Sequence, residues 1–212
     1  MEDILDVYTR KYDKDTVLIC LDEVPKQLIG EIRKPIPAKS GKITRYDTEY
    51  KRNGTCAIFM LSAPLKGWRR AEANEQRTRI EWAYQIKKLL TEDFPKAKKI
   101  VLVMDNLNIH SKGSLYKAFA PEEAKRYCDR LEIQRTYSPN TPKHGSWLNM
   151  AEIEINVLVN HGLKKRIPTL KEMKKQVTAW VKARNNTEKK INWRFTTDDA
   201  RIKLKRLYPQ LL

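Results

Sequence analysis

The chain has 212 residues, of which 41% are hydrophobic and 33% are charged. This length is enough for one sizeable hydrophobic core and does not require a second domain. Lys and Arg number 43 against 26 Asp and Glu, a formal net charge of +17, and residues 161–212 hold 15 of the basic residues against 4 acids. Such a basic excess indicates a polyanionic partner, nucleic acid first and an acidic membrane surface second. No apolar segment is long enough to span a membrane, which disfavours the membrane.

The cysteines Cys20, Cys56 and Cys128 are widely separated, and no pair has the spacing of a zinc site. Cys20 and Cys56 lie within apolar runs, as small core residues of a reducing compartment do. The N-terminus has no basic region followed by an apolar one, so it is not a secretory signal. We therefore expect a cytoplasmic protein that associates with the nucleoid.

In the first half of the chain, the pattern predicts an antiparallel meander. Residues 3–12 have the spacing of a short helix, and the apolar run 17–21 indicates a buried strand. The polar stretch 23–45 contains three prolines, which favours a surface connection over a central strand. Strands at 46–51 and 55–62 would flank a hairpin turn at 52–54, because Asn-Gly is a strong turn signal. A short strand at 68–73 would follow.

The second half predicts helices alternating with strands. A helix is expected over 77–93, because apolar residues recur there at helical spacing. A buried strand at 100–104 follows, then a helix at 121–130, a strand at 131–136 and a loop at 137–145. Ser146 is the predicted N-cap of a helix over 146–160. Helices over 169–182 and 196–207 would place their basic residues outward, in a basic helical part covering about 161–212.

Two aspartates follow buried strands directly. Asp22 comes after VLICL (17–21) and Asp105 after IVLVM (100–104). For one such residue, a turn-initiating Asp is the more ordinary interpretation. Two of them at one edge of a sheet would repel each other unless they share a cation. Oxygen ligands favour a hard ion such as Mg²⁺, so the pattern predicts a metal site that needs a third ligand.

The third ligand is predicted in the helix over 146–160. At about 100° per residue, Glu152 falls near the apolar face formed by Leu148, Ile155 and Val159, whereas Glu154 points nearly the opposite way. A carboxylate near the core is costly unless it binds something. Glu152 is therefore the predicted ligand, and Glu154 is interpreted as part of the solvated face.

Two strand-end aspartates, a helix glutamate and a meander followed by β-α-β match the layout of an RNase H-like nuclease. We therefore expect an α/β fold with a mixed five-stranded sheet and helices on both faces. The sequence also resembles the catalytic domain of DDE transposases, in particular the bacterial insertion-sequence branch of the mariner superfamily. The resemblance covers nearly the whole chain, in the family's order, and is carried by five blocks: CLDEVPKQL (20–28), EYKRNGTCAIFM (49–60), VLVMDNLNIH (101–110), HGSWLNMAEIEI (144–155) and INWRFTTDDARIKLKRLYP (191–209).

The resemblance implies that Asp22, Asp105 and Glu152 are the catalytic, metal-binding triad of a DNA transposase. It implies two Mg²⁺ or Mn²⁺ ions per site, with Asp22 shared between them. The activity would be metal-dependent phosphodiester hydrolysis at the ends of a transposon, followed by attack of the freed 3′-hydroxyl on target DNA. The protein would act on DNA as a homodimer.

The sequence departs from the family's pattern in two respects. Fewer than twenty residues precede the first expected strand, too few for the helix-turn-helix modules that grip transposon ends. We therefore expect residues 1–212 to be a single catalytic domain, with such modules carried by a separate polypeptide if they are used. The interval between Asp105 and Glu152 is also longer than in common mariner relatives, and we expect the extra residues in loops at 111–122 and 138–142.

Several basic residues near the triad are candidate DNA contacts. Lys143 and His144 lie in the loop before Glu152, and Lys164, Lys165 and Arg166 form a basic run after its helix. A loop histidine bonded to nearby backbone explains His144 and also His110 equally well. Two alternative functions stay open. One is an RNase H-like nuclease without strand transfer, and the other is a catalytically inactive, transposase-derived DNA-binding protein.

Overall fold

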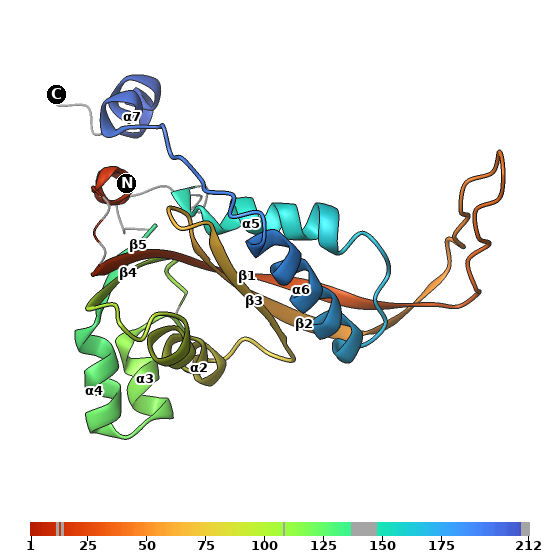
Figure 1. Ribbon diagram of the computed structural model, residues 1–212, viewed down its shortest axis with the longest axis horizontal. Coiled ribbons are helices and arrows are strands. Elements are labelled where there is room, and N and C mark those ends of the chain that lie inside the picture. The colour runs from red at the N-terminus through yellow and green to blue at the C-terminus, as the bar shows by residue number, and fades with distance from the viewer. Residues whose placement is uncertain (12, 14, 108, 137–147, 209–212) are drawn as a thin grey trace.

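The computed structural model describes residues 1–11, 13, 15–107, 109–136 and 148–208 (Figure 1). Its centre is a five-stranded sheet with the strand order β3-β2-β1-β4-β5. The strands are β1 (Thr16–Glu31), β2 (Tyr50–Ala63), β3 (Trp68–Asn74), β4 (Lys99–Met104) and β5 (Leu131–Arg135). The pairs β1–β2 and β2–β3 are antiparallel, whereas β1–β4 and β4–β5 are parallel. The predicted mixed sheet, a meander continued by β-α-β, is confirmed.

The first strand is much longer than predicted. It continues beyond Asp22 to Glu31, so the interpretation of 23–45 as a polar surface connection is wrong for its first part. Pro25 lies within β1, opposite Ala57 of β2. Cys20 is the last residue of β1 that pairs with β4, so from there on β1 has a neighbour on one side only. A proline is tolerated in a strand whose other side lacks a partner.

The predicted hairpin turn at 52–54 is also wrong. The strand β2 runs straight through it, and the register shifts between Gln27 and Ile29 of β1. Asn53 and Gly54 together oppose Leu28, and Gly54 has a φ of 104°. The turn signal is therefore used in a β-bulge, which also needs a residue with positive φ. The true connection is residues 32–49, an arm that extends far from the rest of the molecule (Figure 1).

Helices cover both faces of the sheet, as predicted (Figure 1). One face carries α2 (Arg79–Lys88) with its π-helical continuation Leu89–Asp93, α3 (Lys112–Ala118) and α4 (Pro121–Asp129). The expectation that 111–122 is a loop is wrong, because α3 occupies most of it. Trp82 and Ile86 are fully buried on this face against alternate residues of β1 and β4, such as Ile19 and Leu102.

The opposite face carries α5 (Ala151–Val157), continued by the π-helical turn Leu158–Gly162, and α6 (Leu170–Asn185). The helix predicted over 146–160 starts later than expected, and its predicted N-cap, Ser146, lies outside the described residues. The helix begins at Ala151, whose N–H donates to the side chain of Asn149 at 3.1 Å. The helix predicted over 169–182 is confirmed. Its N-cap Thr169 accepts a hydrogen bond from the backbone N–H of Glu172.

The two ends of the described chain meet. The first helix, α1 (Glu2–Thr9), contacts α7 (Thr197–Lys203), which is followed by a 3₁₀ turn at Lys205–Leu207. Arg201 pairs with Glu2 at 2.8 Å, and the Thr197 hydroxyl donates to Asp6 at 2.7 Å. The predicted helix over 196–207 is thus confirmed for most of its length. Among the described residues, we find no helix with the length and apolarity needed to cross a membrane.

Candidate active site

The register of the parallel pair β1–β4 brings Asp22 and Asp105 together. Cys20 pairs with Val103, so continuing the register by two residues places Asp105 level with Asp22. The pKa of Asp22 is raised to about 7, first by burial and then by the negative charges of Asp105, Glu23 and Glu152, whereas the hydrogen bond from the Glu23 N–H lowers it. These are the effects expected of carboxylates that crowd one half-buried edge of a sheet.

Glu152 reaches the same edge from α5. It lies in the first turn of this helix and is partly exposed, and its charge acts on Asp22. The helix contacts both β1 and β2. The three acids predicted from the sequence therefore interact electrostatically around Asp22, although they lie on three separate elements.

Asn149 joins the element that carries Glu152 to the strand that carries Asp22. Its side chain is 1% exposed, and its Nδ2 donates to the carbonyl oxygen of Leu21 at 2.7 Å. Its Oδ1 accepts from the N–H of Ala151, so one amide group both caps α5 and fixes its start to β1. Sequence reasoning missed this role. The available signal was an N-cap residue type, Asn, three positions before Glu152.

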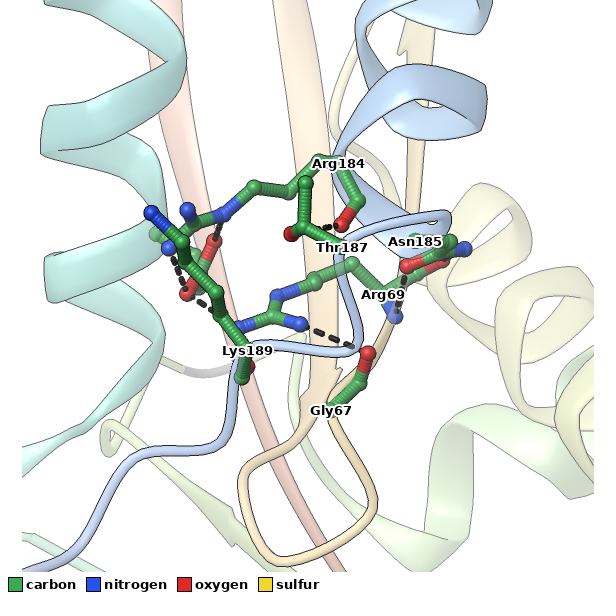
Figure 2. Close-up of polar contacts among 7 residues, drawn as sticks. Gly67, Arg69, Arg184, Asn185, Thr187 and Lys189 are labelled. Carbon is green, nitrogen blue, oxygen red and sulfur yellow. Dashed lines mark hydrogen bonds and ion pairs between the residues drawn. The ribbon is translucent and has the colours of Figure 1, made fainter.

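The interpretation of Glu154 as a solvated residue is wrong. Its side chain is 0% exposed and pairs with Arg69 of β3 at 2.7 Å and with Arg184 of α6 at 3.0 Å (Figure 2). Although burial alone would raise the pKa of Glu154, hydrogen bonds from Arg184 and Arg69 hold it below its usual value. The helical pattern could not reveal this, because Arg69 lies 85 residues earlier in the chain.

Arg69 is itself held from several sides (Figure 2). It is 1% exposed, and its guanidinium donates to the carbonyl oxygens of Gly67, at 2.6 Å, and Lys189. The Asn185 side chain bonds both backbone groups of Arg69, each at 2.8 Å. Glu154 thus fastens α5 to a network that includes β3 and the end of α6. This network fixes the helix that carries Glu152.

A second, fully buried group lies beside the triad. His110 places its Nε2 2.6 Å from Glu23 and its Nδ1 2.6 Å from Asp105, and its ring packs on Trp82 with centroids 5.9 Å apart. Burial disfavours the charged imidazole, but the carboxylates of Asp105 and Glu23 outweigh burial and raise the pKa of His110 to about 9. They hold the pKa of Asp105 below its usual value in return, against the effect of burial.

A comparison with protein families shows which family the chain belongs to. The model of the DDE superfamily endonuclease family matches residues 17–174, a range that contains Asp22, Asp105 and Glu152. The chain belongs to this family. No curated protein matches the chain in sequence. The DDE superfamily endonucleases are a family of enzymes. The DDE family predicted from the five sequence blocks is therefore confirmed.

Solved structures of the Mos1 mariner transposase share the fold. A paired-end complex with the left transposon end has a TM-score of 0.55 at 16% identity, covering 89% of this chain and 55% of that one. The paired-end complex with Mg has a TM-score of 0.56 at 16% identity, with coverages of 89% and 54%. For the strand transfer complex the TM-score is 0.53 at 17% identity, with coverages of 86% and 52%. The chain therefore has the RNase H-like fold, and it spans about half the length of these transposases.

The predicted ligands have the chemistry that a hard divalent cation prefers, but among the described residues Asp22, Asp105 and Glu152 do not form a group whose ligand atoms all lie within 4.8 Å of one another. Asp22, Asp105 and Glu152 offer carboxylate oxygens, and their mutual repulsion would be relieved by a shared positive charge. Among the described residues, the acidic and imidazole ligand atoms that lie within 4.8 Å of one another belong to Glu23, Asp105 and His110. Each ring nitrogen of His110 already contacts a carboxylate. Glu23, Asp105 and His110 therefore pair with one another and do not leave the imidazole nitrogens for a metal ion.

The predicted DNA contacts have different surroundings. Lys164 and Lys165 are exposed and line a surface hollow of about 490 Å³ between the end of the π-helical turn Leu158–Gly162 and the first part of α6. Arg166 lines it too, but its guanidinium pairs with Glu31 at 2.7 Å and donates to the Glu49 carbonyl oxygen at 3.1 Å. The other predicted contacts, Lys143 and His144, lie outside the described residues. For all five residues, DNA contact remains a prediction.

Proposed function

We propose that this chain is the catalytic domain of a DNA transposase. It would hydrolyse phosphodiesters at transposon ends and then join the freed 3′-hydroxyl to target DNA. The observation that carries the proposal is the acid cluster around Asp22, whose pKa is raised to about 7 next to Asp105 and Glu152, in a chain of the DDE superfamily endonuclease family. The shared fold of the Mos1 strand transfer complex supports the transfer step.

Asp22, Asp105 and Glu152 would hold the divalent metal, Mg²⁺ or Mn²⁺, with two ions per site sharing Asp22. When bound, the metal would activate water and stabilise the charge of the leaving oxygen at phosphorus. Mos1 paired-end complexes have been solved with Mn and with Mg, which supports this choice of ions. The chain's own part is to keep the three carboxylates in place: Asn149 fixes the start of α5 to β1, and Glu154 anchors the helix.

The partners would be transposon-end and target DNA, bound by a homodimer in the cytoplasm at the nucleoid. The net charge of +17 supports a DNA partner, and the paired-end Mos1 complexes support a dimeric assembly. Lys164 and Lys165 would contact the phosphate backbone. Residues 1–212 would act as one catalytic domain.

Incubation of the protein with supercoiled plasmid and Mg²⁺ or Mn²⁺ tests the proposal. We expect metal-dependent nicking that is lost in Asp105→Ala, and joining of a supplied 3′-hydroxyl end to the plasmid. Nicking without joining would identify a nuclease that lacks strand transfer. The absence of nicking at every protein and metal concentration, with plasmid binding retained, would refute the enzymatic proposal in favour of a DNA-binding role.

A further inference from the structure

His110 is placed so that one side chain touches two carboxylates from different elements. Glu23 lies in β1 and Asp105 follows β4, and the two ring nitrogens of His110 are each 2.6 Å from one of them. The side chains of His110 and Glu23 are both 0% exposed, whereas that of Asp105 is 29% exposed. His110 therefore connects a buried carboxylate, that of Glu23, with a partly exposed one, that of Asp105.

Glu23 has no evident use other than to hold His110. Successive residues of a strand point to opposite faces, so Glu23 lies on the α2 face while Asp22 points to the α5 face. Its Oε1 contacts His110, and its Oε2 is buried with no hydrogen-bond partner among the described residues. Burying a carboxylate is costly, and this cost is offset only where the charge has a specific partner. Here that partner is His110.

On the other side of the ring, the contact selects one oxygen of Asp105. His110 Nδ1 lies against Oδ1, and the N–H of Leu107 donates to the same oxygen at 3.2 Å. The contacts between described residues leave Oδ2 for another partner. Arg135 of β5 holds the intervening loop, donating to the His110 carbonyl oxygen at 3.2 Å and to Asn106 at 2.6 Å. The direction of the Asp105 carboxylate is therefore set by His110 and the Leu107 N–H, both at Oδ1, and Arg135 holds the loop that carries them.

We propose that His110 is a positioning residue for the metal site: it fixes Asp105 so that Oδ2 is left for the divalent cation, and Glu23 holds His110 in turn. This inference rests on the proposed function, because it takes Asp105 to be a metal ligand. Groups that orient a ligand typically change metal affinity 10- to 100-fold when they are removed. A histidine suits the role because its two nitrogens, on opposite edges of a rigid ring, reach both acids at once.

The test compares Mn²⁺ binding, measured by the EPR signal of free Mn²⁺, in the full chain and its variants. His110→Asn keeps an amide donor near the Nδ1 position that faces Asp105, whereas His110→Gln places it near the Nε2 position that faces Glu23. We expect His110→Gln to raise the Kd for Mn²⁺ at least about tenfold. His110→Asn should raise it less, and Glu23→Gln should also weaken binding.

Ser114→Ala is the matched control. Ser114 is buried in the same segment and its hydroxyl donates to the Ile109 carbonyl oxygen at 2.7 Å, but no contact joins it to Asp105 among the described residues. It should lower stability in urea without changing the Kd for Mn²⁺. Nicking at saturating Mn²⁺ gives a second readout, and we expect His110→Gln to shift the metal requirement more than the maximal rate.

The outcomes separate the two proposals. Wild-type affinity in His110→Gln, or an equal loss in Ser114→Ala, would overturn the positioning role and leave the proposed metal site intact. If His110→Gln does not fold, equal affinities of wild type, His110→Asn and Glu23→Gln would overturn it in the same way. Wild-type protein with no Mn²⁺ site that depends on Asp105 would overturn both proposals together.

Discussion

Replacing Asp22 with asparagine should make the metal-free protein more stable while abolishing its metal response. Burial and three neighbouring acids raise the pKa of Asp22 from the ordinary 3.8 to about 7. At pH 8 the folded protein must therefore carry a charge that its surroundings disfavour. The difference between these pKa values corresponds to an upper bound of about 4 kcal/mol. The amide has nearly the same shape and can still accept the hydrogen bond from the Glu23 N–H.

The sign of the pH dependence follows from proton binding. Between pH 4 and pH 7 the folded state holds a proton on Asp22 that the unfolded state has lost, so the wild-type protein loses stability as pH rises through this window. The gain from Asp22→Asn should therefore be small near pH 4 and complete above pH 7. We expect about 2–4 kcal/mol at pH 8, or an increase in Tm of about 5–15 °C for a chain of this size.

The assay is urea-induced unfolding followed by far-UV circular dichroism at pH 5 and pH 8, with and without Mg²⁺. Metal that binds only the folded state should stabilise the wild type and leave Asp22→Asn unchanged. Asp105→Asn is the matched control. Because His110 holds the pKa of Asp105 below its usual value, this variant should lose about 1–3 kcal/mol instead. A wild-type-like or lower stability of Asp22→Asn at pH 8 would refute the reasoning.

Three further predictions concern the elements around the triad. Glu154→Ala should lower the free energy of unfolding by about 3–5 kcal/mol, measured in urea, because it leaves a buried arginine without its carboxylate. Asn149→Ala should cost about 1–3 kcal/mol and raise the Kd for Mn²⁺, because the bond from α5 to β1 is lost; unchanged metal binding would contradict its role. Lys164→Gln and Lys165→Gln should each weaken plasmid binding, and each should reduce the slope of log affinity against log salt concentration by about one. Lys117→Gln on α3 is the control and should change neither quantity.

Local sequence patterns were sufficient to predict a helix or strand where the residues of that element themselves carry the signal. The apolar run of β4 and the capping residue of α6 identify these elements without reference to the rest of the chain. The choice of Glu152 as a metal ligand, made from its place on the predicted helix, stays a prediction, and of the two glutamates it is Glu154 that is fully buried. The nearness of Glu152 to Asp22 follows from the helix packing on β1 and β2.

The errors arose where a distant segment changed the meaning of a local signal. Asn53-Gly54 is a turn signal only if the chain reverses there, and pairing with β1 turned it into a bulge. Glu154 looks solvated until Arg69 reaches it from β3. The bridge from Glu23 to His110 spans 87 residues, so no local period could reveal it. In these three cases the partner comes from elsewhere in the fold.

The unpredicted length of β1 accounts for the unusual state of Asp22. Up to Cys20 the strand is paired on both sides, and a carboxylate there would have to enter the closed core. Further along, Pro25 is exposed, and an acid at such a position would be solvated and would titrate normally. Asp22 lies between these limits, just past the last pair with β4 but still paired with Met60 of β2. It is therefore buried enough for its pKa to be raised, and it is still partly exposed where β1 has lost its β4 neighbour.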